Sequence, residues 1–134
     1  MSISSGAISA DSAADVRAIG FLAASSTTAV NVSLHFNGTS WSQNTVSHFR
    51  FGGVGPVSAL SPSDVWAVGA GPGVPTGGFS AHPTAVIEHW DGTSWRIVTT
   101  PGGVNFLLGM AASASGTVLA VGQGTNSSGI ILSN

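Results

Sequence analysis

The chain has 134 residues, enough for one domain of ordinary size. Three residues are basic, all of them arginine, five are acidic, and the formal net charge is −2. This balance offers no basic surface to nucleic acid or to anionic lipid headgroups, and it therefore argues against both kinds of partner.

Hydrophobic residues make up 43% of the chain, and the mean hydropathy is +0.38. No apolar run reaches the roughly 18–20 residues of a membrane-spanning helix, and the longest, such as Val104 to Ala112, have the length of a strand. Cysteine is absent, which excludes disulfides and thiolate metal sites. Met1 to Gly6 lack the basic and apolar segments of a signal peptide, which leaves the compartment open, with an extracellular or cell-surface location favoured.

Short β-branched and apolar segments, separated by Gly, Pro, Ser and Asn, predict eleven strands and no helix. In chain order, the first four predicted strands are Gly6–Ser12, Asp15–Ala23, Ala29–Phe36 and Ser40–Val46. The next four are Pro56–Ser61, Asp64–Ala70, Thr84–Trp90 and Ser94–Thr99. The last three are Phe106–Ser113, Thr117–Gly122 and Ser128–Ser133.

These strands fall into three repeats of one sequence pattern. Asp64-Val-Trp-Ala-Val-Gly69 follows Asp15-Val-Arg-Ala-Ile-Gly20 after 49 residues and precedes Thr117-Val-Leu-Ala-Val-Gly122 by 53. Downstream, His89-Trp-Asp-Gly-Thr-Ser-Trp95 follows His35-Phe-Asn-Gly-Thr-Ser-Trp41 after 54 residues. Because two motifs recur in the same order, the sequence predicts three copies of one structural unit.

Two dipeptides predict tight hairpins between the third and fourth strands of a repeat. Asn37-Gly38 and Asp91-Gly92 accept the positive φ values that such turns require. The Thr-Ser that follows each dipeptide is compatible with loops of two, three or four residues. It therefore stays open whether Trp90 and Trp95 share a face of the sheet.

A four-stranded unit that repeats about every 50 residues is typical of a β-propeller blade. The chain resembles kelch or galactose-oxidase-like propeller repeats, and in particular bacterial repeats of the form SPSDVWAVG followed by IEHWDGTSW. Residues 61–69 and 87–95 carry this pattern nearly intact, and the first repeat carries it in degraded form. The resemblance implies a propeller fold and no particular activity.

The repeats predict blades over residues 6–48, 55–101 and 104–134, with the last blade one strand short. Residues 1–5 are expected to act as a swapped or closing strand. Three blades do not close a ring, because propellers typically have 4–8. We therefore expect oligomerisation to complete the ring, a dimer with six blades being favoured over a fragment of a longer propeller.

The candidate ligand-binding residues are Phe79, His82 and Arg17. Phe79 and His82 lie in Gly71–Pro83, a long loop rich in Gly and Pro, and loops on rigid scaffolds often carry function. Arg17 occupies a position that is apolar in the other two repeats. It is expected either to bind an acidic group or pair across a chain interface or, preferably, to pack its stem while its head reaches solvent at a blade edge.

The remaining polar residues of the repeats are expected to be structural. His35 and His89 recur at one repeat position and are expected to form hydrogen bonds across their hairpins. Asp15 and Asp64 are expected to accept backbone N–H bonds in the preceding turn. No carboxylate pair or cluster of metal ligands recurs at a useful spacing, so no catalytic residue, metal or cofactor is expected.

The sequence favours a non-enzymatic propeller module that assembles with itself and presents loops to a ligand, which is a carbohydrate or a protein. One alternative is a purely structural or engineered propeller fragment whose only activity is assembly. A glycan-active enzyme is a third, less favoured alternative, since the expected acid–base pair is missing.

Overall fold

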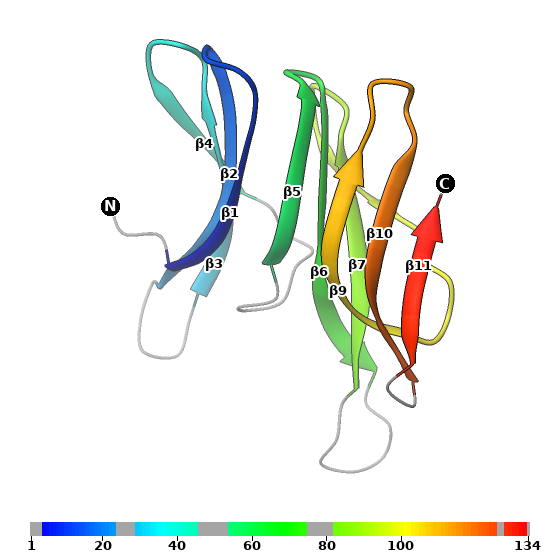
Figure 1. Ribbon diagram of the computed structural model, residues 1–134. Helices are drawn as coiled ribbons and strands as arrows, with labels where there is room; N and C mark the ends of the chain where they lie inside the picture. The colour runs from blue at the N-terminus through cyan, green and yellow to red at the C-terminus, as the bar shows by residue number, and fades with distance from the viewer. Residues whose placement is uncertain (1–3, 24–28, 46–53, 75–81, 126–127, 134) are drawn as a thin grey trace.

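The structure is a computed structural model, and it describes all residues except 1–3, 24–28, 46–53, 75–81, 126–127 and 134. The described residues form three antiparallel β-sheets, two of four strands and one of three. Figure 1 shows these sheets side by side in chain order, with the second between the first and the third. The part of the chain that is described holds no helix with the length and hydropathy to cross a membrane.

Each strand pairs with the next one along the chain. Sheet 1 consists of β1 (Ser4–Ser12), β2 (Asp15–Ala23), β3 (Ala29–Phe36) and β4 (Trp41–Thr45). Sheet 2 consists of β5 (Val54–Ser61), β6 (Asp64–Val74), β7 (His82–Trp90) and β8 (Trp95–Val98). Sheet 3 consists of β9 (Val104–Ala112), β10 (Val118–Gly124) and β11 (Gly129–Ser133).

The prediction of an all-β chain with four, four and three strands is confirmed. Nine of the eleven strands differ from the predicted bounds by a few residues at one or both ends, and the differences in β1 and in sheet 2 bear on the predicted sites. Ser4 and the residue after it belong to β1, where Ser4 pairs with Phe21, so they do not lie in a separate closing strand. In sheet 2, β6 continues to Val74 and β7 begins at His82, because backbone pairing extends beyond the segments with strong β-branched character.

A β-bulge recurs at one repeat position in all three sheets. The register shifts between Ser4 and Ala7 in β1, between Val54 and Val57 in β5, and around Leu108 in β9. The shifts in β1 and β5 lie 50 residues apart, within one residue of the motif offset of 49, and Leu108 lies 53 residues after Gly55, which falls within the shift of β5. The repeats therefore share a backbone irregularity, which hydrophobic patterning alone does not require.

Alternating side chains of the second strand define two faces of each sheet. Face A carries, in sheets 1, 2 and 3 in turn, Val16 and Ala18, Val65 and Ala67, and Val118 and Ala120. Face B carries, in the same order, Arg17 and Ile19, Trp66 and Val68, and Leu119 and Val121.

The sheets pack with face B of one sheet against face A of the next. Ile19 and Ala67 belong to one buried cluster, and Val68 and Ala120 belong to another. The backbone N–H of Ala59 in β5 also donates to the Ser9 hydroxyl of β1, at 3.0 Å. The same contact between faces thus occurs twice within the chain.

The two boundaries differ in chemistry. Between sheets 2 and 3 the buried cluster is wholly apolar and consists of Val68, Ala85, Ile87, Val104, Leu107 and Ala120. Between sheets 1 and 2 the buried apolar pair is joined by five buried polar or charged residues, Asp15, Arg17, Asn31, Ser33 and Glu88. Burial of charge is unfavourable without partners, so the first boundary depends on specific polar contacts.

Candidate functional site

The structure brings together only part of the predicted ligand-binding set. Phe79 lies outside the described residues. The backbone of His82 lies in β7, where it pairs with Val74 of β6. The predicted loop Gly71–Pro83 is therefore shorter than expected, because strand pairing continues into both of its ends.

Arg17 lies at the boundary between sheets 1 and 2, and only 2% of it is exposed. Its Nη2 donates to the carbonyl oxygen of Pro62 at 2.7 Å, and its Cζ lies 5.3 Å from the centroid of the Trp90 ring. Its Nε is 3.9 Å from Oδ1 of Asp15. The expectation that the head reaches solvent is wrong, because sheet 2 covers the guanidinium and supplies the carbonyl and the aromatic face.

The environment of Arg17 acts on its charge in two directions. Burial lowers the pKa of the guanidinium, while the carboxylates of Asp15 and Asp11 raise it. Arginine keeps its proton at any ordinary pH, so the side chain remains a buried cation. Its partners belong to both sheets, and Arg17 therefore links sheet 1 to sheet 2.

The recurring histidines bond to the strand beside them. Nε2 of His35 lies 2.7 Å from Oδ1 of Asp15, and Nε2 of His89 lies 2.9 Å from Oδ1 of Asp64. Trp66 donates its indole N–H to the same Asp64 oxygen at 2.8 Å and stacks on His89, with the ring centroids 4.2 Å apart. The histidines thus form structural hydrogen bonds, and their partners are the aspartates at the start of β2 and β6 rather than groups across the hairpins to β4 and β8.

The two aspartates have partners other than the expected turn donors. The turn N–H groups of Ala14 and Ser63 donate to the hydroxyls of Ser12 and Ser61, both at 3.3 Å. The carboxylates of Asp15 and Asp64 do not accept these turn N–H groups, and they bond to His35 and His89 instead. Among the described residues, no three His, Cys, Asp or Glu side chains are grouped to hold a metal ion.

The hairpins at Asn37 and Asp91 are four-residue turns of one design. Oδ1 of Asp91 accepts the N–H groups of Thr93 and Ser94, both at 2.9 Å. Asn37 accepts the equivalent N–H groups of Thr39 and Ser40, at 3.0 and 2.9 Å. The second turn residues, Gly38 and Gly92, have φ values of +89° and +94°, a region that side chains rarely adopt.

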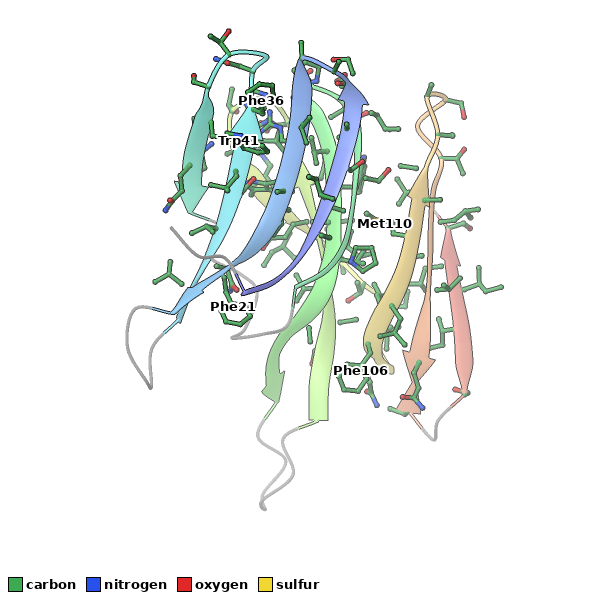
Figure 2. All side chains as sticks on the ribbon, turned by 60° about the vertical axis from the view of Figure 1, so that its left-hand side comes forward. Phe21, Phe36, Trp41, Phe106 and Met110 are labelled. Atoms are coloured by element: carbon green, nitrogen blue, oxygen red, sulfur yellow. The ribbon has the colours of Figure 1, made fainter. Side chains whose placement is uncertain are left out.

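The four-residue loop settles how the hairpin aromatic residues lie. Trp90 pairs directly with Trp95, and their ring centroids are 5.8 Å apart. Phe36 pairs in the same way with Trp41, with the ring centroids 5.3 Å apart, and Figure 2 shows these two side chains next to each other on sheet 1. Each hairpin thus places an aromatic pair on face A of its sheet.

Asp91 makes the second hairpin sensitive to acid. The Thr93 hydroxyl, the N–H groups of Ser94 and Thr93, and the charge of Arg96 together lower the pKa of the Asp91 carboxyl well below its ordinary value. A lowered pKa in the folded state contributes stability above the unfolded pKa of about 3.9, and this stability is lost as the pH falls. We expect Asp91→Asn to melt below the unsubstituted protein at pH 7, and we expect the gap in melting temperature to narrow as the pH falls below about 3.9.

Melting curves between pH 7 and pH 2 measure this difference. Asparagine keeps the two turn bonds, as Asn37 shows in the first hairpin, so the variant is expected to fold. All other residues are the same in the two proteins, so their contributions cancel in the comparison. A gap in melting temperature that stays constant over the whole pH range would contradict the assignment.

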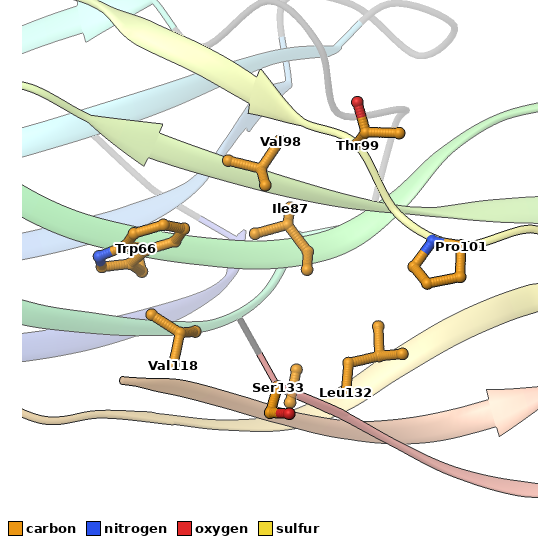
Figure 3. A pocket seen from close by; sticks show the side chains of 9 residues that line it. Trp66, Ile87, Val98, Thr99, Pro101, Val118, Leu132 and Ser133 are labelled. Atoms are coloured by element: carbon orange, nitrogen blue, oxygen red, sulfur yellow. The ribbon is translucent and has the colours of Figure 1, made fainter. Parts of the chain in front are cut away.

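A cavity of about 190 Å³ lies between sheets 2 and 3. Figure 3 shows its two walls, one from sheet 2 and one from sheet 3. The apolar lining residues are Trp66, Ile87, Val98, Pro101, Val118, Ala120 and Leu132. Hydroxyls of Thr99 and Ser133 lie at its margin, and no charged side chain lines it. Such a lining favours an aromatic or aliphatic group over an ion or a polar metabolite.

Sequence reasoning did not find this cavity. The sequence feature that bears on the cavity is one position in the second strand of each repeat, which holds Arg17, Trp66 and Leu119 in turn. A residue at this position lies on face B and covers the next sheet, so Trp66 is placed to line the boundary with sheet 3. Only the spacing of the two sheets decides that space remains beside it.

Both end faces of the stack carry exposed apolar side chains. On face A of sheet 1, Ile8 is 68% exposed, and Val30 and Trp41 are exposed as well. On face B of sheet 3 the exposed large side chains are Leu119, Val121 and Ile131, the last at 77%. Patches of this kind usually mark interaction surfaces.

A scan against protein-family models and searches of the curated proteins and of the solved structures find no match to this chain. The fold and the site define the chain as an all-β protein of three stacked antiparallel sheets built on one repeat.

Proposed function

We propose that this chain is a non-enzymatic β-propeller module whose three sheets are blades, and that two copies assemble into a six-bladed ring. The observation that carries the proposal is the repeated contact between faces. Face B packs on face A at both internal boundaries, and one face of each kind is exposed at the ends of the stack.

The partner for these end faces is a second copy of the chain. Within one chain, sheet 2 separates the exposed face B of sheet 3 from the exposed face A of sheet 1. A second copy supplies the missing face at each end, so that every face A meets a face B. Two copies related by a two-fold axis form two identical interfaces, and six blades fall within the range of roughly four to eight found in closed propellers.

The chemistry of the end faces supports this choice of partner. The exposed side chains Leu119, Val121 and Ile131 are uncharged and short, like those of the internal boundary between sheets 2 and 3. The opposing face presents Ile8, Val30 and Trp41. Burial of such surface is favourable by about 25 cal/mol per Å² of apolar area, and two interfaces add in a closed dimer.

The solution mass tests the proposal. Light scattering at micromolar concentration is expected to give a mass near twice 13.2 kDa, independent of concentration. Val121→Asp on face B and Ile8→Asp on face A are each expected to yield monomers, because a charge would be buried without a partner. Ile97→Asp is the matched control, since Ile97 is exposed on sheet 2, away from both end faces.

Mixing the two monomeric variants sharpens the test. The unsubstituted face B of the Ile8→Asp chain fits the unsubstituted face A of the Val121→Asp chain, so a mixture is expected to form pairs through one interface. A monomer that melts cooperatively without substitution contradicts the proposal. A mass that grows with concentration contradicts ring closure, because it indicates open head-to-tail association.

A further inference from the structure

In sheets 1 and 2, the fourth strand covers the outer edge of the third strand. There β3 and β7 are inner strands, covered on their outer edges by β4 and β8. In sheet 3 the pair Leu119 and Ser133 corresponds to the pair Trp66 and His89 of sheet 2, so β11 is the counterpart of β7. Among the described residues, no strand pairs with the outer edge of β11.

At the boundary between sheets 1 and 2, the hairpin of sheet 2 fills the space between the sheets with aromatic rings. Trp95 packs against the buried pair Ile19 and Ala67. Trp90 lies beside it and is covered by Arg17. The fourth strand β8 therefore contributes a side chain to the contact between sheets as well as backbone hydrogen bonds to β7.

The boundary between sheets 2 and 3 has equivalent residues around this position, but it has no counterpart of Trp95 among the described residues. Trp66 occupies the position of Arg17, Val68 that of Ile19, and Ala120 that of Ala67. The counterpart of Trp95 would stand on a fourth strand next to β11. The cavity lies there, lined by Trp66 and Ala120 (Figure 3).

We propose that the outer edge of β11 and this cavity form a binding site for one extended peptide strand, which adds antiparallel to β11 and inserts a tryptophan into the cavity. The free N–H and C=O groups of an edge strand bind such a segment without regard to its sequence, and the pocket selects the side chain. A dry apolar cavity of about 150 Å³ binds benzene, so the present volume of about 190 Å³ is sufficient for much of an aromatic side chain.

The chain itself indicates the preferred ligand sequence. Residues 92–100 include β8 and place Trp95 directly after a turn, with Ile97 on the same face. In sheet 2, Arg96 of β8 lies opposite His89 of β7. In sheet 3 the counterpart of His89 is Ser133, so the ligand residue that corresponds to Arg96 does not need a charge. The ligand class is thus a β-strand peptide with an aromatic residue followed two positions later by an aliphatic one.

Fluorescence anisotropy with a labelled peptide of residues 92–100 tests the site. We expect saturable binding, and at least about tenfold weaker binding of the same peptide carrying Trp95→Ser, as is usual for loss of a buried anchor. In the protein, Val98→Trp fills the cavity and is expected to abolish binding. Ile97→Trp is its control, because Ile97 lies on the other face of β8 and does not line the cavity.

A covalent version keeps the proposal testable if Val98→Trp fails to fold. Residues 91–100 are appended after Asn134, once unchanged and once with Trp95→Ser in the appended copy. The first extended chain is expected to melt at a higher temperature than the second. Equal binding of the two peptides, no binding of either, or equal melting of the two extended chains overturns the proposal.

This inference depends on the equivalence of the sheets and not on ring closure. The peptide is therefore also added to the monomeric Val121→Asp variant, whose substitution lies on face B, away from the cavity. Binding to that variant supports the strand site whether or not the unsubstituted chain dimerises. A dimer that does not bind the peptide overturns the strand site alone.

Discussion

Replacing Arg17 with alanine is expected to lower the free energy of unfolding by about 3 kcal/mol or more, as is typical when one partner of a buried charged contact is removed. The substitution removes the shorter of the two hydrogen bonds that the Pro62 carbonyl accepts, leaves only the one from the Trp90 indole N–H at 3.2 Å, and uncovers one face of Trp90. It also leaves the buried carboxylate of Asp15 without its neighbouring cation. Chemical denaturation of the variant measures the loss.

Arg96→Ala is the matched control for Arg17. Arg96 also pairs with an aspartate, Asp91, at 2.8 Å, but its side chain is 71% exposed. Exposed ion pairs typically contribute no more than about 1 kcal/mol. If both variants lose the same small amount, the buried guanidinium does not hold sheets 1 and 2 together.

Replacing Leu107 with alanine is expected to cost about 2–5 kcal/mol, while replacing its neighbour Leu108 is expected to cost about 0.5 kcal/mol or less. Leu107 is 3% exposed and belongs to the cluster between sheets 2 and 3. Leu108 is 71% exposed and lies at the β-bulge of β9. The two variants carry the same chemical change on adjacent residues.

Thermal melting at low protein concentration measures this difference without a contribution from association. Leu107→Ala removes apolar atoms from a packed cluster and leaves a cavity, which accounts for the large expected effect. Equal losses for the two variants would show that the bulge does not turn Leu108 away from the core.

Local sequence signals determined the strands and the turns. β2 and β3 run over Asp15–Ala23 and Ala29–Phe36, as predicted, because β-branched and apolar runs bounded by turn residues have few other conformations available. The Asn-Gly and Asp-Gly steps lie in turns with positive φ at glycine, since only glycine adopts that region without strain. The three strands of sheet 3 were also predicted from the order of the motifs.

The tertiary structure decided which surfaces these strands present. Hydrophobic alternation does not show that sheet 2 covers the Arg17 guanidinium, because the carbonyl of Pro62 and the ring of Trp90 come from a repeat about 45 or more residues away. Loop length decided that Trp90 and Trp95 share a face, and a shift of one residue would have separated them. The cavity beside Trp66 likewise depends on how far apart two sheets lie, and that distance is set by side chains of both sheets together.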